Sequence, residues 1–253
     1  QNREFNLMPQ SNFDSYFSKV YQERWTYLSE ALGQSEIQVA RINSFCSENE
    51  PDFASLELGL RGCRPAVGAS AIPRASSGLL KSYVMDPGSI IAARALQVQS
   101  GDLVLDMCAA PGGKSLILIE ALSQGGGAYL NELSPPRRER LKKVIQQYVP
   151  RDIRDRVWIT GKDAIKFGLS HSETFDRILL DTPCSGERHM SAKDKVHWKL
   201  SSSQRLAAKQ YGLLCSALLA LKPKGRLVYS TCSLSPLENN GVIEKYLKKK
   251  TNA

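Results

Sequence analysis

The stretch that decides the fold is Leu105-Asp-Met-Cys-Ala-Ala-Pro-Gly-Gly-Lys-Ser115. A short apolar run that reads as a strand, 103–107, ends within this stretch, and a helix-length segment near 114–123 begins at its end. Small residues between a strand and a helix let backbone amides approach a ligand closely. The spacing is neither GxGxxG nor GxxxxGK[ST], so it argues against a dinucleotide site or a P-loop. The stretch therefore predicts a different kind of ligand loop in an α/β fold.

The same alternation of strand and helix continues to the end of the chain. Further strand candidates lie at 128–132, 157–160, 177–181 and 226–230, and helix candidates lie near 135–148, 203–221 and 236–249. Strands rich in Val, Ile and Leu with helices between them predict a Rossmann-like parallel sheet covered on both faces. Ligands of such sheets bind outside the carboxyl ends of the strands, where we expect the functional residues.

The first 80 residues have a different character. The segment 13–28 has apolar residues at helical spacing with aromatic side chains on one side, and 66–78 is rich in small residues and reads as a loop. We therefore predict an N-terminal helical and loop extension over 1–80, followed by an α/β domain over 81–253.

Composition restricts the classes of partner. The chain has 253 residues, a net charge of +9 and a pI of about 9.3, which suits a polyanionic partner but also suits solubility. No apolar run approaches the roughly 20 residues that span a bilayer, so we expect no membrane partner. The six cysteines include no CxxC pair and only three His accompany them, so we expect no metal site and an intracellular protein with free thiols.

Carboxylates follow the second and third predicted strands. Glu132 is placed to accept hydrogen bonds from ribose hydroxyls, and Asp163, beside Ala164, is placed to accept one from an adenine amino group. Each acid alone could equally be a solvated surface carboxylate. Their recurrence after successive strands favours a bound nucleoside.

Two cysteines follow the fourth and fifth predicted strands. Cys184 and Cys232 stand among Ser, Thr, Pro and Gly, where a core residue would be unusual. A single cysteine is more often a small buried hydrophobe, and Cys215, Cys46 and Cys63 fit that interpretation. We therefore predict that the first two act as a pair.

One reaction that requires a thiol is methylation of carbon 5 of cytosine. Thiolate attack on carbon 6 makes carbon 5 nucleophilic enough to accept a methyl group. Asp181 is placed to hydrogen-bond the ring nitrogen, and Cys184 is a candidate to assist release of the product.

Three motifs in this order resemble the Nop/Sun family of RNA cytosine-5 methyltransferases. They are the loop 105–115, Asp181-Thr-Pro-Cys-Ser and Ser230-Thr-Cys-Ser, and the resemblance covers about residues 81–247. The segment 83–90 also resembles the family's segment that packs beside the active site.

The resemblance implies a site for S-adenosylmethionine and a role for each cysteine. Glu132 would hold the ribose with Arg137 nearby, Asp163 would hold the adenine, and Asp181 would line both pockets. The cysteine of Thr-Cys, Cys232, would attack the base, and that of Pro-Cys, Cys184, would assist product release. The methionine part of the cofactor would be wrapped by Cys108, Ala109, Ala110, Pro111, Gly112, Gly113 and Lys114.

Basic residues after the Pro-Cys motif are candidates for RNA contacts. They are Arg188, Lys193, Lys195 and Lys199, with Trp198 as a platform for base stacking. The alternative is a solvated, charged lid. The target base would have to be single-stranded or flipped out of its stack.

The resemblance leaves the substrate open between rRNA, which we favour, and tRNA. We expect a cytoplasmic protein, with the mitochondrial matrix as the alternative, and a protein partner that supplies RNA recognition is compatible with the sequence. The family's fold continues into an antiparallel strand pair, whereas this sequence ends at Ala253, so we expect a longer chain or another element to cover the last strand.

Three rival functions rank behind the RNA enzyme. A DNA cytosine-5 methyltransferase would use the Pro-Cys cysteine as its nucleophile. A non-catalytic RNA-binding factor would need neither thiol, and a small-molecule methyltransferase would not need the basic charge.

Overall fold

The computed structural model describes residues 13–34, 37–46, 63–65, 72–122, 125–190, 194–195 and 197–251. The chain divides into two compact units. The larger unit contains Glu36–Asp181 and Cys215–Tyr229, and the smaller contains Gln1–Ser35, Thr182–Leu214 and Ser230–Ala253. No helix in the described ranges is long and apolar enough to cross a membrane.

The larger unit is built on a five-stranded sheet with the order β6-β5-β4-β7-β8. β4 pairs in parallel with β5 and β7, and β5 pairs in parallel with β6. This confirms the predicted Rossmann-like α/β fold. The strands are β4 (Leu103–Asp106), β5 (Gly127–Asn131), β6 (Val157–Thr160), β7 (Phe175–Asp181) and β8 (Leu221–Ser230).

The predicted elements are present with small shifts of their ends. β8 begins five residues before the predicted 226, and the helix α10 (Asn240–Thr251) begins four residues after the predicted 236. A turn precedes α10, in which the amide of Gly241 donates to the carbonyl of Pro236. The other helices expected from the sequence are α4 (Gly113–Ala121), α5 (Pro135–Tyr148) and α9 (Leu200–Ala220).

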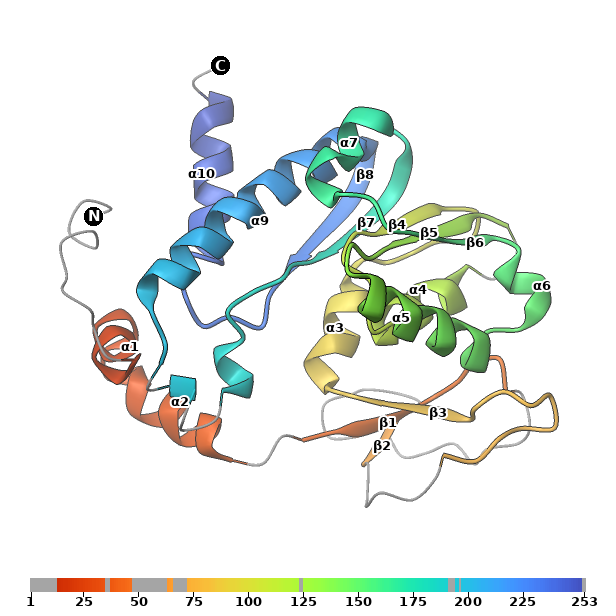
Figure 1. Cartoon of the computed structure of the whole chain (residues 1–253), viewed down its shortest axis with the longest axis horizontal. Coiled ribbons are helices and arrows are strands. Elements are labelled where there is room, and N and C mark those ends of the chain that lie inside the picture. The colour runs from red at the N-terminus through yellow and green to blue at the C-terminus, as the bar shows by residue number, and fades with distance from the viewer. Residues whose placement is uncertain are drawn as a thin grey trace. The chain divides into compact units, whose positions relative to one another are not determined.

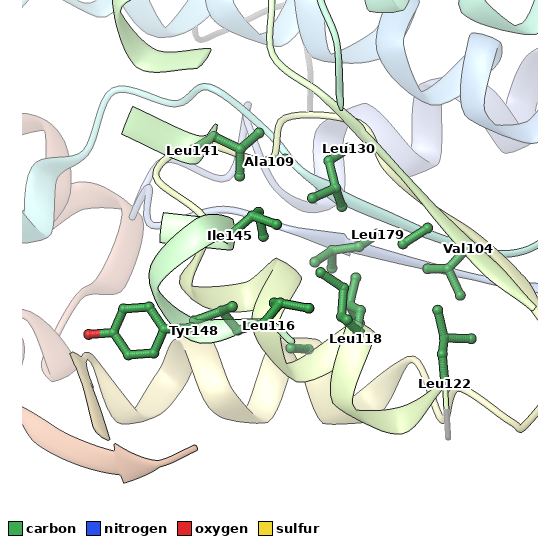
Figure 2. Close-up of a cluster of buried hydrophobic side chains, with 14 of the residues drawn as sticks. Val104, Ala109, Leu116, Leu118, Leu122, Leu130, Leu141, Ile145, Tyr148 and Leu179 are labelled. Carbon is green, nitrogen blue, oxygen red and sulfur yellow. The ribbon is translucent and has the colours of Figure 1, made fainter. Parts of the chain in front are cut away.

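Three helices cover one face of the sheet (Figure 1). They are α3 (Pro87–Ala95), α4 and α5, and their apolar side chains form one buried cluster with Val104, Leu130 and Leu179 of the strands (Figure 2). α3 begins where the Asp86 carboxylate accepts a hydrogen bond from the Ser89 amide, the usual cap of a helix start. The short helix α6 (Arg151–Arg154) follows α5.

The opposite face is covered by a short helical segment. Tyr129 of β5 stands between Ala128 and Leu130, which belong to the buried cluster of the first face, so its side chain points to the opposite face. There it packs edge-on against Phe175. Phe167, the first residue of α7 (Phe167–Ser170), packs on the same Phe175 ring. α7 follows the 3₁₀ turn η2 (Ala164–Lys166), and the Gly168 amide donates to Ser216 of α9. Helices thus cover both faces, as predicted.

A small antiparallel sheet changes the predicted domain boundary at residue 80. β1 (Val39–Ile42) lies between β2 (Cys63–Pro65) and β3 (Ser82–Met85), with the order β2-β1-β3. Because β1 hydrogen-bonds to β3 across that boundary, residues 39–46 belong to the larger unit and are no separate extension.

The smaller unit contains α1 (Phe13–Tyr21), α2 (Arg24–Gly33), the 3₁₀ turn η3 (Glu187–His189), α10 and the first two thirds of α9. The aromatic face predicted for the N-terminal segment is buried. Phe13, Phe17 and Trp25 pack together with Trp198 from the segment before α9. The N-terminal helices therefore belong to the unit that also carries residues 182–190 and 230–235.

One buried amide ties together the ends of three strands in the larger unit. The Asn131 side chain, 1% exposed, donates from Nδ2 to the carbonyls of Met107 (3.3 Å) and Lys162 (3.0 Å). Its Oδ1 accepts from the Thr160 hydroxyl (2.8 Å) and the Lys162 amide (2.9 Å). These bonds fix where the loops after β4, β5 and β6 begin, which is where the fold places ligands.

Substitution of Asn131 by Ala tests this role. The variant leaves buried carbonyls and an amide without partners, so we expect the free energy of unfolding to fall by about 2–4 kcal/mol. Urea unfolding followed by circular dichroism measures the change. A loss below about 0.5 kcal/mol, the range of ordinary surface substitutions, would show that the strand ends do not depend on this amide.

Candidate active site

A cavity of about 200 Å³ lies in the larger unit at the carboxyl end of β4. Its lining contains the whole predicted loop from Cys108 to Lys114, together with Asp106 and Asp181. Tyr83 and Met85 of β3 complete the wall, which agrees with the expectation that the 83–90 segment packs beside the site.

Two glycines allow the loop to pass close to its neighbours. Gly112 has φ +121°, and a Cβ there would lie 3.0 Å from Val144 Cγ1 and 3.1 Å from Leu141 Cδ1. A Cβ at Gly113 would lie 2.7 Å from the Tyr83 ring. The loop therefore needs glycine at both positions, and α4 begins directly at the second.

Asp106 is the buried carboxylate beneath the loop. It is 1% exposed, and its Oδ2 accepts a hydrogen bond of 2.7 Å from the Ser115 hydroxyl of α4. The pKa of Asp106 is raised to about 7, mainly because the group is buried and also because Asp181 carries a nearby negative charge, while the Ser115 hydrogen bond acts in the opposite direction. This group joins the last residue of β4 to the first turn of α4.

Lys114 and Asp181 form an ion pair in the cavity wall. The Lys114 Nζ lies 2.8 Å from Asp181 Oδ2, and both side chains are partly exposed. The pair gives the cavity one fixed cation and one hydrogen-bond acceptor at the end of β7.

Glu132 and Arg137 brace the same loop from the next strand. Glu132 is 5% exposed, and its Oε1 accepts from the Ser134 amide at 2.9 Å. Arg137 lies 3.4 Å from Glu132 Oε2 and donates to the carbonyl of Ala110 at 2.8 Å. Among the described residues Glu132 Oε2 has this ion pair but no hydrogen-bond donor, and neither Glu132 nor Arg137 belongs to the cavity lining.

Asp163 and Ala164 lie after β6, as predicted, but outside the cavity lining. The Asp163 carboxylate is exposed and accepts a hydrogen bond of 3.1 Å from the Ile165 amide, which begins the η2 turn. Ala164 is buried. A role in binding adenine stays a prediction for both.

The smaller unit brings the two predicted cysteines into direct contact. Cys184 Sγ and Cys232 Sγ lie 2.8 Å apart, and the Cys232 amide also donates to Cys184 Sγ at 3.3 Å. Cys232 is exposed, whereas Cys184 is half-buried. The accessible thiol is thus the one to which the sequence assigns the attack.

The hydrogen bond from the Cys232 side chain lowers the pKa of the Cys184 thiol below its usual value. Burial acts in the opposite direction, and backbone amides of Cys232 and Gly186 add to the lowering. The lowered pKa favours the thiolate form of Cys184, the form that can accept a proton.

The predicted RNA-contacting side chains differ in their surroundings. Arg188 and Lys199 are exposed, and Lys195 is half-buried with its Nζ 5.4 Å from the centre of the Phe13 ring. Lys193 lies outside the described residues.

The structure corrects the prediction of Trp198 as a base-stacking platform. Its indole is 8% exposed and packs against Phe13, Tyr16 and Phe17, while its Nε1 points to Glu187 Oε1 at 3.4 Å. With its side chain buried against the aromatic residues of α1, the indole is not available to stack on a base.

Four polar residues that organise the site were missed from the sequence. Asp106 and Asn131 end their strands, so their place offered a signal like that of Glu132. Glu187 and Glu238 offered none, because nothing in the sequence shows that an acid in a polar loop will be 0% exposed.

The known proteins similar to this chain include several RNA methyltransferases. Residues 93–253 match the family described as 16S rRNA methyltransferase RsmB/F. The 5-cytosine rRNA methyltransferase NSUN4 of Mus musculus is 33% identical over 92% of this chain and 72% of its own length. The mitochondrial tRNA (cytosine(34)-C(5))-methyltransferase of Mus musculus is 32% identical over 95% of this chain and 75% of its own.

A solved structure is similar over most of the chain. A methyltransferase homolog protein from Pyrococcus horikoshii aligns with a TM-score of 0.69 and 26% identity, covering 90% of this chain and 75% of that protein. The alignment with NSUN4 of Bos taurus spans only 45% of the length of that relative, compared with 72% for NSUN4 of Mus musculus.

Replacing Asp106 by Asn tests the buried carboxylate. Because burial raises its pKa in the folded protein, the protonated form favours folding, and stability is lost as the pH rises toward about 7. From pH 5 to pH 8 we expect the free energy of unfolding to fall by about 2–3 kcal/mol more in the wild type than in Asp106→Asn. Urea unfolding at both pH values measures this difference, and equal slopes would contradict the assignment.

Replacing Cys232 tests the thiol contact. Cys232→Ala removes the side-chain donor, so the pKa of Cys184 should rise toward its ordinary value, whereas Cys232→Ser retains a donor and should keep it low. The measurement is the pH dependence of iodoacetamide alkylation at Cys184, followed by peptide mass spectrometry. The same midpoint in both variants would show that the contact does not stabilise the thiolate.

Proposed function

Because the chain belongs to the RsmB/F family of 16S rRNA methyltransferases, we propose that it methylates carbon 5 of cytosine in RNA. The observation that carries this proposal is the contact between Cys184 and Cys232, 2.8 Å apart. Covalent activation of cytosine requires one thiol to bond to the base. A second thiol beside it can serve the later release of the adduct, and a protein that merely binds RNA needs neither.

The larger unit fits the cofactor that such a reaction needs. S-adenosylmethionine supplies an electrophilic methyl group when it is bound. We expect the loop Cys108–Lys114 to hold its methionine part, and Glu132 Oε2 to accept a bond from its ribose. Asp163 remains the candidate for its adenine. Two observations support this assignment: the small residues that line the cavity, and the buried Glu132 Oε2, which accepts no hydrogen bond within the described residues.

The exposed thiol of Cys232 is the proposed nucleophile. After its proton is lost to solvent, Cys232 Sγ bonds to carbon 6, and carbon 5 becomes able to accept the methyl group. We expect Asp181, paired with Lys114, to hydrogen-bond the ring nitrogen and stabilise the adduct.

Cys184 is the proposed base for release. Once Cys232 Sγ is bonded to the base, its side-chain hydrogen bond to Cys184 is lost, while the Cys232 backbone amide still donates to Cys184 Sγ. Cys184 then takes the proton of carbon 5. The electrons of that C–H bond re-form the ring double bond, the C6–S bond breaks, and Cys232 leaves as a thiolate.

The substrate RNA and the compartment are finer proposals. The family description and NSUN4 favour rRNA, whereas the second mouse relative acts on tRNA and is almost equally similar. Because that relative is described as a mitochondrial enzyme, the mitochondrial matrix is favoured over the cytoplasm. Arg188, Lys195 and Lys199 are the proposed phosphate contacts, which would make binding weaken with salt, and a protein partner could add further recognition.

A trapping assay tests the proposal. Wild type, Cys232→Ala, Cys184→Ala and the control Cys215→Ala are incubated with tritiated S-adenosylmethionine and either small-subunit rRNA or tRNA. Methylcytosine is then measured, and protein–RNA adducts are separated on a denaturing gel. Cys215 lies on α9 and serves as a cysteine outside the thiol pair.

We expect Cys232→Ala to lose adduct and product by about 1,000-fold or more, and Cys184→Ala to accumulate adduct while product falls. Cys215→Ala should behave as wild type. Methylation by Cys232→Ala together with an inactive Cys184→Ala would contradict the assignment and favour the arrangement of DNA cytosine-5 methyltransferases.

A further inference from the structure

Two buried acids of the smaller unit have no part in the chemistry proposed above. Glu187 and Glu238 are both 0% exposed. Burying a carboxylate is unfavourable unless hydrogen bonds compensate for the lost water. Their partners therefore show what these acids hold in place.

Glu238 holds the loop that carries Cys184. Its Oε2 accepts from the Ser185 amide at 3.0 Å and from Gln210 Nε2 at 2.9 Å, and its Oε1 lies 2.5 Å from the Ser185 hydroxyl. Gln210, also 0% exposed, donates in addition to the carbonyl of Pro183 at 2.9 Å. The residues on both sides of Cys184 are thereby fixed.

Asn239, the next residue along the chain, holds the loop that carries Cys232. Its Nδ2 donates to the carbonyl of Ser233 at 2.9 Å, and its Oδ1 accepts from the Thr231 hydroxyl at 2.5 Å. The residues on both sides of Cys232 are therefore fixed from the same turn that fixes the Cys184 loop.

Glu187 joins the two loops directly. Its Oε2 accepts from the Leu234 amide at 3.1 Å, beyond Cys232, and its Oε1 lies 2.5 Å from the Ser185 hydroxyl, beside Cys184. The hydroxyls of Ser185 and Ser233 are themselves 2.9 Å apart. The residues that follow the two cysteines thus share one buried polar network.

We propose that Glu187, Gln210, Glu238 and Asn239 form a clamp that sets the separation of the two thiols. The clamp residues are positioning residues, because they touch the cysteine loops and not the thiols themselves. The inference rests on the proposed function and extends it to a step: a fixed separation keeps Cys184 where it can accept the proton of carbon 5 after Cys232 has bonded to the base.

Glu238→Gln and Asn239→Ala test the clamp from its two sides. Glutamine replaces one carboxylate oxygen with a donor that faces other donors, and alanine removes both bonds to the Cys232 loop. The matched control is Glu244→Gln, the same chemical change at an exposed position on α10.

In the trapping assay we expect both variants to release product about 10- to 100-fold more slowly, with the KM for RNA and for S-adenosylmethionine changed by less than about 3-fold. Adduct should accumulate relative to product, since misplacing Cys184 slows release more than attack. Partial unfolding alone would lower adduct and product together. Glu244→Gln should match wild type.

A second measurement needs no RNA. Loosening the Cys232 loop withdraws the donors to Cys184, so the pH midpoint of its alkylation should rise in Asn239→Ala but not in Glu244→Gln. Glu238→Gln is left to the trapping assay, because it also removes a nearby negative charge that raises the pKa of Cys184. If Glu238→Gln fails to fold, Asn239→Ala still gives both the ratio of adduct to product and the alkylation midpoint. An unchanged midpoint with adduct and product in the wild-type ratio would overturn the clamp.

The controls separate the two proposals. If wild type forms no adduct that depends on Cys232, the proposed function fails. If it does and the clamp variants keep the wild-type ratio of adduct to product, only the clamp fails.

Discussion

The buried amide of Asn131 is the constraint on which the cofactor half of this molecule depends. Its side chain makes hydrogen bonds at 2.8–3.3 Å to Met107, Thr160 and Lys162, and its backbone carbonyl accepts from Ala109. A parallel sheet leaves its strand ends as separate loops, and an amide with two donors and two acceptor lone pairs can join several of them. These bonds hold the beginning of the small-residue loop after β4, of the segment with Glu132 after β5, and of the segment that leads to the η2 turn after β6.

The two halves of the chemistry have opposite effects on the charge of a buried acid. Around the cavity, burial disfavours the charged form of Asp106 and its pKa is raised to about 7, while Asp181 forms an ion pair with Lys114. Around the thiols, hydrogen bonds from Cys232 lower the pKa of Cys184 despite its burial. The chain connects the halves covalently, since β7 ends at Asp181 and Cys184 follows three residues later.

Much of this arrangement could be predicted because it follows from local sequence. The period of the apolar residues predicts β4 to β8, and the motifs mark where chemistry follows each strand. The domain boundary could not be predicted, because the pairing of β1 with β3 is a contact across some 40 residues of sequence. Trp198 was misassigned for a related reason: its burial depends on α1, which lies far away in the chain.

The buried acids show where sequence patterns stop being informative. Glu187 and Glu238 look like surface residues of polar loops, and only the folded chain reveals the amides and hydroxyls that bind them. An acid is compatible with a buried site when its partners come from several segments at once. Sequence spacing does not record such partners.

The measurement that tests the central claim most directly is tritium release from RNA labelled at carbon 5 of cytosine. The protein is incubated with this RNA and unlabelled S-adenosylmethionine, and tritium in water is compared with methyl groups gained by the RNA. Methylation at carbon 5 predicts one tritium released per methyl group transferred, because that carbon must lose its hydrogen. Methyl transfer without tritium release would place the methyl group on another atom and contradict the account.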